Sequence, residues 1–324
     1  MAIQQLEGIH FARESMSYID ALHAVLTHRG AFAESKPMLA GMTAMGFRFT
    51  VHRRLAAPSA TAYNWLAEHF VAADLIGIAS AQHAGFSFDP TFPLYRKHAV
   101  AAIKASIDRG AAAVFWKDAF VVASGYDDEA QTLFYLDGSG VQRLPYADFG
   151  RCESPYWYYQ ASESQVPLDP LEVYRESLMQ AIHFWESHDA LLPESEYACG
   201  EQAYDALIQA LTDSAGFDPA EAAAVLETYA AAKRDIAAYA GRLAQLWPGC
   251  GGLAACYGEA ASLFGEAAGT LAAGTLAAEG DAAAAVRAAS LLREAQRHER
   301  DAIAHIKLFM RETVQNRFHD VALR

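Results

Sequence analysis

The sequence is poor in basic residues and in cysteine, and both shortages narrow the classes of protein it can belong to. Lysine and arginine number 25 against 39 aspartate and glutamate residues, so the formal net charge is −14 at pH 7. So acidic a chain repels phosphate backbones, and we expect no nucleic-acid partner. The four cysteines, Cys152, Cys199, Cys250 and Cys256, show no C-x-x-C spacing. This pattern fits a reduced, cytoplasmic protein.

Long uncharged apolar segments are also missing. The N-terminus has no basic segment followed by an apolar one, so we expect no signal peptide. The alanine-rich stretch at 253–286 is interrupted by Glu259 and Glu266, so we expect no membrane span and no membrane partner. What the chain does have is 53% hydrophobic residues over 324 positions. That is enough for sizeable cores in two domains or one large one.

The order of the local patterns predicts an α+β fold. Helical periodicity comes first, and three short apolar runs at 112–116, 119–123 and 133–136 follow, separated by turn residues. Such runs are typical of a meander of buried strands. Pro167 and Pro170 then indicate a linker, and the remaining patterns are helical. We therefore predict an N-terminal domain with an antiparallel sheet at 1–165 and an all-α helical domain at 166–324.

The chain is organised around the helical stretch at 15–26. Ile19 and Leu22 belong to its apolar face, while Ser15 and Ser17 precede that face and Asp20 lies in the first turn. A helix N-terminus carries unpaired N–H groups and a partial positive charge, so it can activate a nucleophile or bind an anion. A serine at this position more often only caps the helix, and from these residues alone we favour the cap.

This stretch resembles the nucleophile helix of papain-like cysteine enzymes, as in the bacteriocin-leader peptidases and their relatives. In those families a cysteine begins the helix and a leucine follows five residues later, a spacing held here by Ser17 and Leu22. Residues 119–127 resemble the strand that carries the catalytic histidine and ends in Gly-Tyr-Asp. Residues 133–138 resemble the next strand, whose Asp or Asn orients that histidine.

A narrower resemblance lies just after the first helix. Residues 36–42, Lys-Pro-Met-Leu-Ala-Gly-Met, with Gly46 and Phe47, resemble the Glu-Pro-Met-Leu-Phe-Gly-Leu…Gly-Phe pattern of the butirosin biosynthesis protein H family. That family combines a papain-like N-terminal part with a helical C-terminal part. The resemblance implies acyl transfer from a carrier-protein thioester to an amine in natural-product biosynthesis.

Two members of the family's triad are replaced. The cysteine falls at Ser17 and the histidine at Ala119, and only the third member survives, as Asp137. A serine hydroxyl needs a base and alanine cannot accept a proton, so we do not expect a classical cysteine protease. One hypothesis is acyl-group handling by an acyltransferase-like or cyclase-like protein, with Ser17 as nucleophile or oxyanion-side donor. Asp137 and Asp20 would be the nearby acids.

The alternative hypothesis is a catalytically inactive pseudoenzyme that binds a biosynthetic intermediate or a carrier protein. Both hypotheses predict a small-molecule or carrier-protein-bound acyl substrate as partner and no cofactor. Homo-oligomer formation and the identity of the substrate stay open.

Three other features are weaker candidates. Cys199 stands in the turn before a helix and is either a minor candidate nucleophile or a small buried side chain. The aromatic run at 156–159 could line a cleft between the domains or form a core between them. Four residues of metal-ligand type share one stripe of the last helix: Glu294, His298, Asp301 and His305. We read that stripe as a half-buried face and predict no metal.

Overall fold

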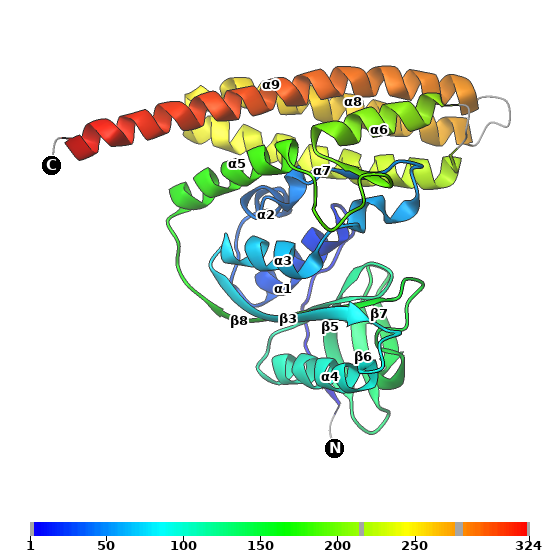
Figure 1. The fold of residues 1–324 in the computed structure, drawn as a ribbon. Helices are drawn as coiled ribbons and strands as arrows, with labels where there is room; N and C mark the ends of the chain where they lie inside the picture. Colours follow the sequence, from blue (N-terminus) through cyan, green and yellow to red (C-terminus); the bar gives the residue numbers. More distant parts are fainter. Residues whose placement is uncertain (1–2, 214–216, 276–280, 323–324) are drawn as a thin grey trace. The chain divides into compact units, whose positions relative to one another are not determined.

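The computed structural model describes residues 3–213, 217–275 and 281–322, which form a mixed α and β backbone (Figure 1). It divides into two compact units. Unit 1 comprises Met1–Leu39 and Trp65–Asp169, and unit 2 comprises Ala40–Asn64 and Pro170–Arg324. The chain passes from unit 1 to unit 2 for the last time between residues 169 and 170, close to the predicted domain boundary between residues 165 and 166. Residues 40–64, which we had placed in the first domain, belong to unit 2 by their contacts.

Unit 1 contains a seven-stranded sheet in which all pairs of neighbouring strands are antiparallel, as predicted. In order across the sheet the strands are β3 (Ile78–Phe86), β8 (Tyr156–Gln165), β4 (Ala113–Trp116), β5 (Phe120–Asp127), β6 (Thr132–Leu136) and β7 (Val141–Pro145). The short strand β1 (Gln4–Gln5) pairs with β5. The predicted meander is β4 to β6, and it continues into β7. Strand β8 returns from further along the chain to lie between β3 and β4.

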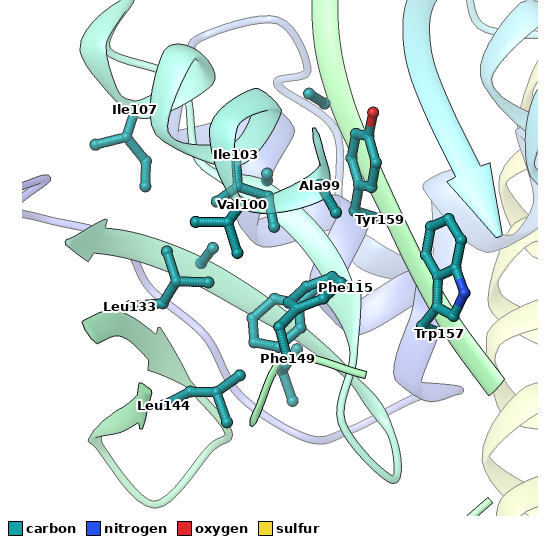
Figure 2. Packing of buried hydrophobic residues seen from close by; sticks show 14 of the residues in the cluster. Ala99, Val100, Ile103, Ile107, Phe115, Leu133, Leu144, Phe149, Trp157 and Tyr159 are labelled. Atoms are coloured by element: carbon teal, nitrogen blue, oxygen red, sulfur yellow. The ribbon is translucent and has the colours of Figure 1, made fainter. Parts of the chain in front are cut away.

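Helix α4 (Phe92–Asp108) covers one face of this sheet. Successive residues of a strand point to opposite faces, and Phe115, Trp157 and Tyr159 all point towards this helix. Figure 2 shows Val100 and Ile103 of α4 directed at the face of the sheet on which Phe115 lies. The aromatic run at 156–159 therefore lies in β8, where Trp157, Tyr158 and Tyr159 are buried in unit 1 and Tyr156 is exposed. The expectation that the run lies between the domains stays a prediction, and what the sequence did not indicate is the pairing of β8 with β3 and β4.

The other face carries α1 (Ser17–His28) and α3 (Trp65–Asp74), which contact β5 and β3 respectively. Tyr18 of α1 and His69 of α3 stack with 3.4 Å between ring centroids and an interplanar angle of 1°. Tyr158 of β8 meets the His69 ring edge-on at 5.0 Å. Helix α1 ends two residues before Gly30, whose φ of +71° favours glycine.

Unit 2 is mainly helical. Its helices are α5 (Pro170–Glu186), α6 (Glu201–Thr212), α7 (Pro219–Leu246), α8 (Gly251–Thr275) and α9 (Asp281–Ala322), with short 3₁₀ turns at Met45–Phe47, Ala57–Thr61 and Pro248–Cys250. Helix α2 (Lys36–Met42) begins in unit 1 and ends in unit 2, and unit 1 has one further 3₁₀ turn at Tyr146–Asp148. Among the described residues, no helix is long and apolar enough to span a membrane.

One strand in unit 2 was not predicted. Strand β9 (Tyr197–Cys199) pairs antiparallel with β2 (Thr50–His52), so residues 166–324 are not all helical. Tyr229 of α7 contributes to the same local structure, because its hydroxyl accepts a hydrogen bond from the Thr50 N–H at 3.0 Å. These pairings attach residues 50–52 to unit 2. They join segments well over a hundred positions apart, which explains why the local pattern did not indicate them.

Candidate functional site at the start of helix α1

Ser17 is the first residue of α1 and does not cap it. The N-cap position belongs to Met16, which has an extended backbone and supplies no side-chain cap. Our preferred interpretation, that one of the two serines merely caps the helix, is therefore wrong, because neither occupies the N-cap position. The half-buried hydroxyl of Ser17 instead accepts a hydrogen bond from the Phe120 N–H, with 3.4 Å between N and Oγ. Because Phe120 follows Ala119, this bond brings Ser17 to the start of β5, where the resemblance places the histidine.

Asp20 lies one turn into α1 and is almost completely buried, with 1% of its surface exposed. Its carboxylate accepts the backbone N–H groups of Glu14 and Ser15 at 3.1 to 3.3 Å. It also pairs with Lys36, with 2.8 Å between Nζ and Oδ1. Burial raises the pKa of Asp20, and the bonds from Lys36 and the two amides oppose that rise. These contacts fold the loop that leads into α1 around one carboxylate.

Asp137 follows strand β6 and is directed into its own turn. Its Oδ1 accepts the N–H and the hydroxyl of Ser139, both at 2.8 Å. Its backbone carbonyl accepts a hydrogen bond from Arg13 Nε. Partial burial would raise the pKa of Asp137, but the two Ser139 bonds and the Arg13 charge outweigh it and hold the pKa below its usual value. The carboxylate is therefore ionised at neutral pH and engaged with Ser139.

Lys117 and Asp118 in the turn between β4 and β5, and Cys152 in the segment before β8, are polar groups that the sequence analysis did not select as site residues. Lys117 pairs with Asp118 at 2.7 Å, and this bond raises the pKa of the lysine, which stays protonated. The half-buried Cys152 thiol donates to the Trp116 carbonyl at 3.8 Å. Burial, with the Asp118 charge, raises the pKa of that thiol. Lys117 is therefore no general base at neutral pH, and Cys152 is no activated nucleophile.

A buried polar network lies on the face of the sheet that carries α1 and supports the start of that helix. The Tyr18 hydroxyl donates to Gln160 Oε1 at 3.0 Å, and burial raises the pKa of that hydroxyl. Gln160 Nε2 donates in turn to Ser80 and Gln82 at 3.2 Å each. The Tyr158 hydroxyl donates to the same Gln82 oxygen at 3.1 Å. This network holds in place the residue next to Ser17.

The weaker candidates lie elsewhere. Cys199 is buried in β9 of unit 2, with its sulfur 3.6 Å from Thr50 Oγ1. On α9, His298 is half-buried, and the other three residues of the predicted stripe, Glu294, Asp301 and His305, are exposed. In the described parts of the chain, no group of three or more His, Cys, Asp or Glu residues converges as a metal site.

Unit 2 also buries a charge pair that the sequence analysis missed. Lys233 of α7 and Glu299 of α9 lie 2.6 Å apart, with side-chain exposures of 1% and 3%. The Tyr204 hydroxyl of α6 donates to the other Glu299 oxygen at 2.5 Å. The lysine ammonium lies over the ring of Phe49 at 4.8 Å. The only signal in the sequence was a charged residue at an inward-facing helical position on each of two helices.

The comparisons with known proteins add no family or relative. No model of a known protein family matches the chain, and no curated protein matches it either. The resemblance to papain-like enzymes and to the butirosin family therefore stays a prediction that depends on the residues quoted for it.

Proposed function

We propose that unit 1 is a variant of the papain-like fold and that it handles acyl groups in natural-product biosynthesis. The observation that carries this proposal is the position of Ser17. Its hydroxyl begins a helix that packs on an antiparallel sheet, and it is held against the start of β5 by the Phe120 N–H. This is the arrangement expected of a papain-like nucleophile site in which the sulfur has been exchanged for oxygen.

The surroundings of Ser17 favour binding a carbonyl group over forming an acyl-enzyme. In the described residues the hydroxyl oxygen accepts one hydrogen bond, from Phe120, and no imidazole or carboxylate is bonded to it. The hydroxyl proton remains available to a substrate carbonyl, and the N-terminus of α1 adds its partial positive charge. Both interactions strengthen as negative charge develops on the carbonyl oxygen.

The reaction that fits is the attack of an amine on a bound acyl thioester. The amine nitrogen forms a bond to the carbonyl carbon, the carbon–sulfur bond breaks, and the proton lost by the amine goes to the departing thiolate. Ser17 would donate to the carbonyl oxygen throughout and would not become acylated. Asp20 and Asp137 would position the loop before α1 and the turn after β6, in keeping with their hydrogen bonds.

The test combines intact-protein mass spectrometry with product analysis. The protein is incubated with an acyl N-acetylcysteamine thioester and a primary amine. We expect amide formation without a stable protein adduct, and we expect Ser17→Ala to lower the rate about 100-fold. Ser15→Ala, in the loop two residues before Ser17, is the matched control and should retain the rate. An adduct on Cys199 or Cys152, or equal rates in wild type and Ser17→Ala, would contradict the assignment.

A catalytically inactive binding module is the second candidate, and two observations favour it. The buried Asp20 carboxylate is occupied by Lys36 and two backbone amides, and position 119 carries no base. Tight binding of a non-reactive acyl amide, together with no amide formation from any thioester and amine pair, would favour this candidate over the first.

A further inference from the structure

His69 of α3 is a fully buried imidazole that contacts both chain segments of the Ser17 site. Its ring stacks on Tyr18, the residue after Ser17, with 3.4 Å between the ring centroids and 1° between the planes. The ring of Phe120 lies edge-on to the same imidazole at 5.0 Å. The Phe120 N–H is the donor to the Ser17 hydroxyl. His69 therefore joins the start of α1 to the start of β5, the two segments that this hydrogen bond connects.

The rings of Tyr18, His69 and Phe120 form a closed triangle. Tyr18 and Phe120 also meet each other edge-on, at 5.5 Å, and both are buried. Tyr158 of β8 contacts the imidazole from a further side, at 5.0 Å. Side chains packed on several sides do not shift one at a time, because protein interiors hold little free space. A displacement of the ring at position 69 is therefore transmitted to α1 and to β5 together.

The stack of Tyr18 on His69 has a geometry that two phenyl rings avoid. Carbon atoms in contact lie about 3.5–4.0 Å apart, so a centroid distance of 3.4 Å leaves no lateral offset between the rings. Aromatic pairs prefer an offset or an edge-on arrangement to a face-to-face stack, because the two negative faces repel each other. A phenyl ring at position 69 would therefore slide along the ring of Tyr18 and carry that side chain out of its present position.

Hydrogen bonds fix the imidazole and the tyrosine relative to the sheet. The His69 carbonyl accepts a long hydrogen bond of 3.5 Å from Gln160 Nε2. The Tyr18 hydroxyl donates to Oε1 of the same glutamine at 3.0 Å. Tyr18 is thus held at its ring face by His69 and at its hydroxyl by Gln160, and the residue before it is Ser17.

We propose that His69 is a positioning residue for the Ser17 site. By holding Tyr18 against Phe120, it sets the distance between the Ser17 hydroxyl and the Phe120 N–H. This inference rests on the function proposed above and adds to it a side chain that acts only through its neighbours. The effect on the reaction is large because a misplacement of about 1 Å can lower a rate about 100-fold.

The kinetics of amide formation by the full-length chain test this role. His69→Phe keeps a buried ring, and we expect it to lower kcat about 10-fold with KM unchanged, since position 69 acts on orientation and not on substrate binding. Ile103→Ala is the matched control, because Ile103 is equally buried but packs on the opposite face of the sheet. The control destabilises unit 1 and should keep the wild-type kcat. Circular dichroism at the assay temperature verifies that both variants are folded.

A second measurement does not depend on the reaction. In Ser17→Cys the thiol replaces the serine hydroxyl, and its rate of alkylation by iodoacetamide reports how well the Phe120 N–H and the helix N-terminus stabilise the thiolate. Adding His69→Phe should slow alkylation at pH 7 about 5-fold, because a thiolate that loses a donor has a higher pKa. Adding Ile103→Ala should leave the alkylation rate unchanged.

Unchanged kcat and unchanged alkylation with His69→Phe would overturn the proposal, and so would equal losses with Ile103→Ala. A higher KM with kcat unchanged would also overturn it, because position 69 would then act on substrate binding.

The two proposals fail in different ways. If the wild type forms no amide but His69→Phe slows alkylation in the Ser17→Cys background, the proposed function fails and His69 still positions residue 17. If amide formation depends on Ser17 and His69→Phe changes neither kcat nor alkylation, the positioning role fails and the proposed function stands.

Discussion

The buried pair of Lys233 and Glu299 offers a quantitative test of the structure of unit 2. Both side chains are almost inaccessible to water, and the second Glu299 oxygen is occupied by the Tyr204 hydroxyl. Lys233→Met removes the positive charge and leaves a buried carboxylate with one donor. Glu299→Met leaves a buried ammonium among aromatic rings, with the Tyr204 hydroxyl deprived of its acceptor.

The expected magnitudes follow from these contacts. Breaking a buried ion pair by removing one partner costs about 3–5 kcal/mol, so each single variant should lower the free energy of unfolding by that amount. The double variant Lys233→Met/Glu299→Met removes both charges of the pair, and its remaining cost is the unpaired Tyr204 hydroxyl, about 1–3 kcal/mol. Adding Tyr204→Phe should recover most of that remainder. The two single effects are therefore strongly non-additive.

Urea unfolding followed by circular dichroism at 222 nm measures these differences, because most helical residues belong to unit 2. The exposed pair of Arg287 and Glu266, 2.8 Å apart on α9 and α8, is the control. Arg287→Met should cost less than about 1 kcal/mol. Additive costs in the Lys233 and Glu299 variants, or single effects as small as that of Arg287→Met, would refute the reasoning.

Two further predictions concern a glycine contact and an ion pair. A Cβ at Gly41 would lie 2.1 Å from the ring of Tyr239, so Gly41→Ala should destabilise unit 2 by several kcal/mol, about 2–4. Gly258→Ala in α8, where no atom lies within 4 Å of the new Cβ, should be neutral or stabilising by urea unfolding. In unit 1, the hydrogen bond from Lys104 lowers the pKa of Asp128. The stability that this bond adds is present above pH 3.8 and is lost as the pH falls through the pKa of Asp128 in the folded state. The difference in urea midpoint between wild type and Asp128→Asn should therefore shrink from pH 7 to pH 3.

The parts of the fold that follow from local sequence were predictable. The apolar face of 15–26 and the stop at Gly30 indicate α1, and the three apolar runs with their turns indicate β4 to β6. The parts that depend on distant pairing were not. The alternating rings of 156–159 face two different helical layers, and only the position of β8 between β3 and β4 explains that alternation.

The candidate site was also predictable only where it depends on local sequence. The sequence places Ser17 at the start of a helix, but whether the serine caps that helix depends on a backbone conformation at Met16 that no pattern indicates. The contact between Ser17 and Phe120 joins residues 103 positions apart, and only the family resemblance suggested it.

The resemblance places the family's catalytic histidine at Ala119, and this correspondence can be tested by introducing cysteine at position 17 and histidine at position 119. In Ser17→Cys the thiol lies at a helix N-terminus, and in Ser17→Cys/Ala119→His an imidazole is added to the residue next to the Phe120 N–H. A histidinium and a helix N-terminus together lower a cysteine pKa from about 8.5 into the range of about 3.5–7.5. We expect iodoacetamide to alkylate the double variant at pH 6 at least 10-fold faster than the single one. Equal rates would mean that residue 119 does not face Ser17, and the correspondence with the papain-like triad would then be lost even though the helix packs on the sheet.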